Sequence, residues 1–255
     1  MIRDPNEVRE AMAPDGSEGK REGPEMASAV APAASASGKR SDVLKSITAS
    51  YFFLRRGLAI LAIAFPFALF ALAGIQESLS AYYHCTGDVC GPSAGDGKAR
   101  DVLVGVLWAT ATFLIFYRGY TRKEDWALNL AGVAAAGVAF FPSDFPAIDG
   151  RSPIGKIHFT SGLVFFLAIA FVCLFCAKET LKELKDEAKV RRFKRTYAGL
   201  GTLMVAVPLA VLALHFLRDK AERSYYVLGI ELAGLFVFAA FWLFKSKEVS
   251  LIEKQ

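Results

Sequence analysis

Apolar residues along this chain gather into six long stretches that are separated by shorter polar segments. Each stretch has about 16–21 residues, and about 20 helical residues cross a hydrocarbon core that is about 30 Å thick. The six stretches are 57–75, 102–117, 126–141, 157–177, 198–217 and 225–244. The pattern predicts an all-α fold, a polytopic membrane bundle of six transmembrane helices over residues 51–255.

The first 50 residues have a different character. They show no apolar period, and residues 27–38 form a low-complexity run of Ala, Ser and Pro. Such a segment buries too little apolar surface to offset the entropy that it loses on ordering. We therefore expect residues 1–50 to be a disordered cytoplasmic N-terminal tail. Because the first residues lack the apolar core of a signal peptide, we expect the first membrane helix to be an uncleaved anchor.

The composition fits a membrane protein. Hydrophobic residues make up 54% of the chain, charged residues 22%, and the mean hydropathy is +0.35. A soluble domain of this length covers its surface with polar groups and is rarely so apolar. These values argue against a soluble enzyme, a disulfide-stapled secreted module and a β-barrel.

The basic residues predict how the helices are oriented. The segments 39–56, 118–125, 178–197 and 245–255 together hold nineteen Lys and Arg residues, against seven in the segments on the opposite side. Because cytoplasmic flanks collect these residues, both termini are expected in the cytoplasm. The same flanks account for the net charge of +5. We expect membrane lipids and no nucleic acid as partners, and the sequence names no protein partner.

The four cysteines form two pairs. Cys85 and Cys90 lie in the predicted outer loop, where a structural disulfide is favoured over two free thiols. Cys173 and Cys176 fall within an apolar stretch. We interpret them as small buried side chains rather than as a redox motif.

Polar and ionisable side chains gather where the predicted helices end on the outer side. Such groups are costly at membrane depth, so they are the first places to look for function. The candidate site residues are Glu77, Ser80, His84, Asp101, Asp144, His158, Ser161, His215 and Glu231.

The chain has only three histidines, His84, His158 and His215, and all of them fall on this outer side. If they converge, three imidazoles and a water would form the ligand set of a catalytic zinc site, which makes zinc the candidate cofactor. The alternative is ordinary polar packing, in which an interfacial histidine bonds to loop carbonyls. The sequence leaves both interpretations open.

Carboxylates and serines would complete such a zinc site. Asp101 or Asp144 would orient a ligand or act as the base on the bound water. Ser80 or Ser161 would donate to a developing oxyanion.

Glu231 is surrounded by apolar residues in the last stretch. A glutamate there is expected to pair, to stay protonated, to bind a cation or to carry a proton. The alternative is a protonated glutamate in an interhelical hydrogen bond. Its nearest candidate partners in the sequence are His215 and Arg218.

Four runs carry a resemblance to known proteins: ESLSAYYH (77–84), RDVLVG (100–105), FFPSD (140–144) and IHFTSG (157–162). Over roughly residues 50–245 the chain resembles an uncharacterised family of bacterial six-helix membrane proteins, and this resemblance implies no activity. More loosely, a bundle with scattered His, Asp and Ser is similar to the superfamily of alkaline ceramidases and progestin/adiponectin-type receptors. That similarity implies a zinc-dependent hydrolase of lipid amides, with His84, His158 and His215 as ligands and Asp101 and Ser80 in supporting roles.

Three functional classes follow from the sequence, and it leaves open whether the protein is an enzyme. The first is an integral membrane protein that acts in binding, sensing or assembly without chemistry of its own. The second is a zinc-dependent membrane hydrolase of lipid amides or esters. The third is a small transporter or channel with Glu231 as its coupling or selectivity residue.

Overall fold

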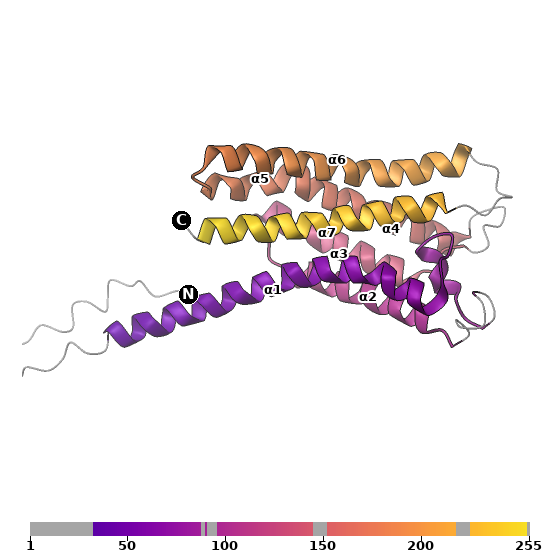
Figure 1. The fold of residues 1–255 in the computed structure, drawn as a ribbon, viewed down its shortest axis with the longest axis horizontal. Helices are drawn as coiled ribbons and strands as arrows, with labels where there is room; N and C mark the ends of the chain where they lie inside the picture. Colours follow the sequence, from indigo (N-terminus) through magenta and orange to yellow (C-terminus); the bar gives the residue numbers. More distant parts are fainter. Residues whose placement is uncertain (1–32, 88–89, 91–95, 145–151, 218–224, 254–255) are drawn as a thin grey trace, which may run out of the picture. The chain divides into compact units, whose positions relative to one another are not determined.

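The structure is a computed structural model that describes residues 33–87, 90, 96–144, 152–217 and 225–253. The chain divides into two compact units, Met1–Lys45 and Ser46–Gln255. Throughout the described residues the regular elements are helices, as Figure 1 shows. The predicted all-helical fold class is confirmed.

The described residues form six long helices. They are α1 (Ala33–Ala73), α2 (Lys98–Phe116), α3 (Arg122–Phe140), α4 (Pro153–Phe171), α6 (Glu187–Leu217) and α7 (Tyr226–Glu253). A short 3₁₀ helix, Ser80–His84, follows α1. Between α4 and α6 the chain passes through a π-helical turn at Val172–Cys176, the short α5 (Ala177–Thr180) and a 3₁₀ turn at Leu181–Glu183.

Four helical segments are long and apolar enough to cross a membrane. They are Lys45–Ala73, Lys98–Phe116, Pro153–Glu183 and Tyr226–Glu253. In α3 the first four residues are all charged, which leaves a shorter apolar run. In α6 the charged residues occupy the first turns. These four segments support the interpretation that the chain is a membrane protein, and the six predicted spans stay a prediction.

The start of α1 differs from the sequence prediction. Residues 33–50 are helical, although we expected disorder up to residue 50. Alanine is the strongest helix former, and a helix that is already nucleated adds residues at low cost, so the first span extends backwards along the chain. Residues 1–32 of the expected tail lie outside the described residues.

Within residues 46–255, consecutive helices pack as neighbours: α2 against α3, α3 against α4, α4 against α6, and α6 against α7. Small residues allow the close approach of α2 and α3. A Cβ on Gly132 would lie 2.8 Å from the backbone oxygen of Ala111, so glycine is required there. Ala131 and Ala135 are buried along the same helix.

The helices place their ends at two opposite sides of this unit (Figure 1). We call the side where α1, α3 and α6 finish and α2, α4 and α7 begin the His158 end. The opposite side, where α7 finishes, is called the Lys245 end. The sequence predicts that the His158 end faces out of the cell and the Lys245 end faces the cytoplasm.

Candidate functional site

A cavity of about 610 Å³ lies inside the bundle, and all six long helices contribute to its wall. This volume is in the range of cavities that hold small ligands. One part of the wall is polar and the other is apolar, and α4 and α7 contribute residues to both parts.

Polar side chains form the part of the wall at the His158 end. They come from the segment after α1, the segment after α3, and the second turns of α4 and α7. These residues are Ser78, Ser80, Ser143, Asp144, His158 and Glu231. They are far apart in the sequence and meet because four helix ends lie together at this side of the bundle.

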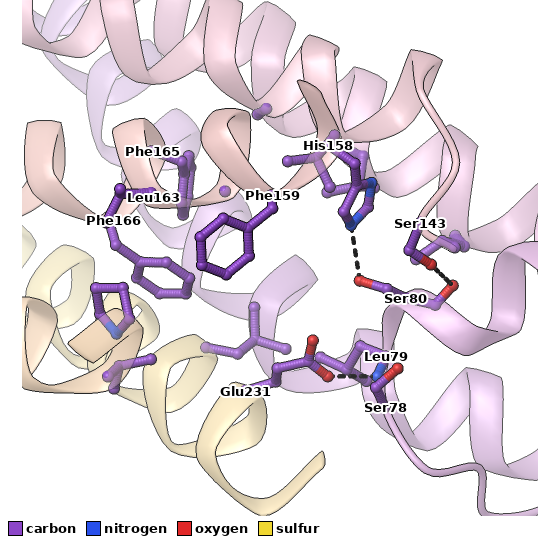
Figure 2. Close-up of a pocket in the computed structure, with 18 of the residues that line it drawn as sticks. Ser78, Leu79, Ser80, Ser143, His158, Phe159, Leu163, Phe165, Phe166 and Glu231 are labelled. Atoms are coloured by element: carbon purple, nitrogen blue, oxygen red, sulfur yellow. Dashed lines mark hydrogen bonds between the residues drawn. The ribbon is translucent and has the colours of Figure 1, made fainter. Parts of the chain in front are cut away.

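The deeper part of the wall is apolar and largely aromatic. Phe159, Leu163 and Phe166 of α4 face Leu235 and Phe238 of α7 across it. Figure 2 shows the rings of Phe159 and Phe166 between the two helices, beside the polar residues. From His158 to Phe166 the helix advances by about 12 Å, so the cavity has a polar head and a long apolar body.

Glu231 lies on the second turn of α7 and turns its carboxylate toward the cavity (Figure 2). The backbone N–H of Leu79 donates to its Oε2 at 2.5 Å. The start of α7 is also tied to this segment, because the N–H of Leu228 donates to the backbone oxygen of Glu77 at 3.1 Å. The observed partner of Glu231 is therefore a backbone amide, while the side chain of His215 and the whole of Arg218 lie outside the described residues.

His158 uses both ring nitrogens. Its Nδ1 lies 2.7 Å from the backbone oxygen of Phe141, and its Nε2 lies 3.0 Å from Oγ of Ser80 (Figure 2). Because a carbonyl oxygen can only accept, Nδ1 carries the proton and donates to Phe141. In the neutral ring, Nε2 is then the acceptor, and the hydroxyl of Ser80 donates to it.

The 3₁₀ helix that carries Ser80 is fixed to the chain after α3. Nε2 of His84 lies 2.7 Å from the backbone oxygen of Ser143, and Oγ of Ser143 donates to the backbone oxygen of Ser80 at 3.3 Å. These contacts hold the 3₁₀ helix, and Ser80 with it, in the polar part of the cavity wall.

The same 3₁₀ helix is braced from its other side. Cys85 and Cys90 form a disulfide with a Cα–Cα distance of 5.1 Å, which confirms the predicted pair. The hydroxyl of Tyr82 donates to the backbone oxygen of Gly74 at 2.5 Å, and burial raises the pKa of this phenol above its usual value. The disulfide closes a short local loop after the 3₁₀ helix, and the Tyr82 hydroxyl ties this helix to the end of α1.

Asp144 binds Ser152, the residue that caps the start of α4. It accepts from the backbone N–H of Ser152 at 3.1 Å and from the Ser152 hydroxyl at 2.5 Å. A Cβ on Gly155 would overlap the carboxylate of Asp144, so the glycine allows this close approach. Its bonds fit a structural role, although Asp144 also borders the cavity.

The structure brings together some of the predicted site residues and separates others. Ser80, Asp144, His158 and Glu231 line one cavity, and His84 braces it through Ser143. Asp101 is exposed on α2, and its Oδ1 lies 3.4 Å from Nη2 of Arg100. Ser161 packs against Gly137 of α3, and neither Ser161 nor Glu77 is among the cavity-lining residues.

The sequence offered a zinc site of three histidines as a candidate. Among the described residues, no three His, Cys, Asp or Glu side chains lie close enough together to hold a metal ion. In this arrangement the bonds to Phe141 and Ser80 occupy both nitrogens of His158. The side chain of His215 lies outside the described residues, so the site of three histidines stays a prediction.

Sequence reasoning missed a buried polar cluster at the Lys245 end. Lys245 and Glu248 are 2% and 0% exposed, although we counted residues 245–255 among the cytoplasmic flanks. Nζ of Lys245 donates to Oγ1 of Thr180 at 2.5 Å and lies 3.5 Å from Glu248, which also accepts from the hydroxyl of Tyr197. A signal for this burial was present in the sequence. The apolar residues Trp242, Val249 and Ile252 continue the helical period of α7 past Lys245.

Near this cluster, Cys173 and Cys176 are free and buried, as we interpreted them. Comparison of the chain with protein-family models, with curated proteins and with solved structures finds no match. Inference about its function therefore starts from the cavity and the side chains around it.

Proposed function

We propose that this protein is an integral membrane protein that binds a single-chain amphiphile in the cavity. The polar head of the ligand lies beside Glu231 and His158, and its chain lies among the phenylalanines. The observation that carries this proposal is the change of the cavity wall from polar to aromatic along α4 and α7.

Glu231 favours a head group that donates hydrogen bonds. One carboxylate oxygen already accepts from Leu79, while the carboxylate as a whole faces the cavity (Figure 2). A carboxylate can accept at about four lone-pair positions, so it has capacity left for a hydroxyl, an amide N–H or an ammonium group. A glycerol head, which offers hydroxyl groups, has the required chemistry.

The apolar part of the cavity favours one chain. From Phe159 to Phe166 it extends about 10 Å along α4, which suits a single short acyl or alkyl chain. An acyl chain that moves from lipid into such a cavity gains little free energy, because both surroundings are apolar. The head-group contacts therefore decide which amphiphile is bound.

The placement in the membrane belongs to the same proposal. α3 and α6 cross the bilayer together with the four apolar segments, both termini are in the cytoplasm, and the membrane is the bacterial inner membrane. In this arrangement the polar part of the cavity lies near the outer interface, where a head group can reach it from the lipid surface.

Two glycine substitutions test the binding proposal. The ligand is a radiolabelled short-chain monoalkylglycerol, an ether that cannot be hydrolysed, and its affinity is measured on protein in nanodiscs. Gly162 lines the cavity and no atom lies within 4 Å of its Cβ position, so Gly162→Leu adds a side chain at the cavity wall. Gly105 of α2 is exposed with equally open space, so Gly105→Leu is the matched control.

We expect Gly162→Leu to lower the affinity at least about tenfold, a loss of about 1.4 kcal/mol, and Gly105→Leu to leave it unchanged. Both variants replace a helical glycine, so neither is expected to destabilise the helix. Equal affinities of Gly162→Leu and the unmodified protein would contradict the proposal.

A further inference from the structure

Two residues of the polar wall have the geometry of a nucleophile and its base. The hydroxyl of Ser80 donates to Nε2 of His158 at 3.0 Å, and the protonated Nδ1 of His158 donates to the carbonyl of Phe141 at 2.7 Å. A nucleophile within hydrogen-bond reach of a base, with the base oriented by a third group, is the arrangement that activates serine in acyl transfer.

We propose that this constellation makes the protein a serine esterase of single-chain fatty acyl esters. Ser80 is the nucleophile, His158 is the general base, and the carbonyl of Phe141 fixes the tautomer and direction of the imidazole. The inference rests on the proposed function, because the amphiphile in the cavity is the substrate.

The cavity positions such an ester with its carbonyl beside Ser80. The acyl chain runs along Phe159 and Phe166, which belong to the same helix as His158. Free hydroxyl groups of the alcohol part reach Glu231. Because Glu231 is bonded to Leu79, the residue before Ser80, the head-group acceptor and the nucleophile lie beside each other. A monoacylglycerol carries all three features: one chain, one ester and free hydroxyl groups.

The reaction needs only water as co-reactant. Oγ of Ser80 attacks the ester carbonyl carbon and forms the new C–O bond, while its proton passes to Nε2 of His158. The bond from the carbonyl carbon to the alcohol oxygen then breaks, and His158 returns the proton to that oxygen. Water attacks the acyl-serine with His158 again as base, and this step releases the fatty acid and restores the hydroxyl of Ser80.

The surroundings of Ser80 keep its hydroxyl in place. The 3₁₀ helix is held by the bond from the Tyr82 hydroxyl to the Gly74 carbonyl and by the bond from Ser143 to the Ser80 carbonyl. His158 is carried by the second turn of α4, whose start is capped by Ser152. A nucleophile and a base on two such fixed elements have the preorganisation that catalysis requires.

Covalent labelling tests the dyad directly. Purified protein in nanodiscs is treated with an alkyl fluorophosphonate, the adduct is located by peptide mass spectrometry, and fatty acid release from a short-chain monoacylglycerol is measured in parallel. We expect the adduct on Ser80. Ser80→Ala should lose both label and hydrolysis, and His158→Gln should slow both at least about 100-fold, because an amide cannot take up the proton. Ser161→Ala, on the same helix as His158 and outside the cavity lining, should keep both.

The binding assay with the ether separates the two proposals. If the unmodified protein binds the monoalkylglycerol but is neither labelled nor hydrolytic, the esterase is overturned and the binding function stands. Label on another serine, or hydrolysis that persists in Ser80→Ala, also overturns the esterase. If neither the ether nor the fluorophosphonate binds, both proposals fail together.

Discussion

The His158 end and the Lys245 end of the bundle both hold charged side chains between helices, and they surround them differently. Lys245 and Glu248 are almost completely buried, and their partners Thr180 and Tyr197 are side chains of neighbouring elements. Glu231, at the other end, is bonded to a backbone amide and borders a cavity of about 610 Å³. Ionisable groups that are enclosed by neighbouring side chains stabilise the fold, whereas a carboxylate that borders a cavity is available to a ligand.

Aromatic packing accounts for much of this difference. At the Lys245 end, Tyr197 and Trp242 both contact Phe241 edge to face, and Trp242 also contacts Tyr117, whose hydroxyl accepts from Nε of Arg55 at 2.8 Å. These rings fill the space between the helices and buried charges. At the His158 end, the rings of α4 line the cavity and leave its volume open.

The largest expected effect comes from breaking the buried pair of Lys245 and Glu248. Lys245→Met leaves Glu248 buried without its ammonium neighbour, and we expect the free energy of unfolding to fall by about 3–5 kcal/mol. The double variant Lys245→Met/Glu248→Met removes both charges and should be more stable than either single variant. Denaturant unfolding in mixed micelles measures all three. Additive losses in the double variant would contradict the pairing.

A smaller effect is expected at the His158 end, and it falls on binding rather than stability. Glu231→Gln keeps an oxygen that accepts from Leu79 but replaces the other carboxylate oxygen by an amide NH2 group, which donates and cannot accept from the head group. We expect the affinity for the monoalkylglycerol to fall by about tenfold, with little change in the free energy of unfolding. Glu253→Gln, an exposed carboxylate near the end of the same helix, is the control and should change neither quantity. A stability loss as large as that of Lys245→Met would remove the distinction between the two ends.

The smallest effect concerns a charge that is exposed at the Lys245 side. Asp186 accepts from the backbone N–H groups of Ala188 and Lys189 at 2.9 and 3.1 Å, which caps the start of α6. The N–H of Lys189 and its ammonium group lower the pKa of Asp186 below its usual value. A lowered pKa in the folded state stabilises the fold above the unfolded pKa of about 3.9, and this contribution is lost as the pH falls through the folded pKa.

Asp186→Asn keeps the capping oxygen and removes this titration. Its free energy of unfolding should therefore change less than that of the unmodified protein as the pH is lowered from neutrality to the acid range. Denaturant unfolding at a series of pH values measures the difference. Identical pH profiles of the two proteins would show that the carboxylate charge of Asp186 does not stabilise α6.

Much of the fold could be predicted from the sequence, because local signals determine it. Long apolar stretches predicted the helices, and the place of Cys85 and Cys90 in a predicted outer loop favoured their bond. The start of α1 was misplaced, since the apolar period that marks a span says little about how far a helix continues into a polar segment. Lys245 was assigned to a basic flank because its charge was counted without its place on the buried face of α7.

The site was predictable only in its residue types. Ser80, His158 and Glu231 were candidates because they are polar groups at helix ends, but Ser80 and His158 are 78 positions apart in the chain and meet only through the packing of α4 against the segment after α1. The cavity beside them exists because many side chains together leave space between the helices, and no single residue in the sequence predicts such a space. Asp101 has the same local character as Asp144, yet it lies outside the cavity lining.

The central claim is that an amphiphile occupies this cavity, and photocrosslinking tests it most directly. A monoalkylglycerol with a diazirine at the end of its chain is added to the protein in nanodiscs, and the crosslinked residues are identified by mass spectrometry. We predict adducts on the cavity-lining side chains of Phe166 and Phe238, which are competed by unlabelled ether and lost in Gly162→Leu. Adducts confined to exposed side chains of the same helices, such as Leu167 and Phe236, would place the amphiphile on the outside of the bundle and contradict the account.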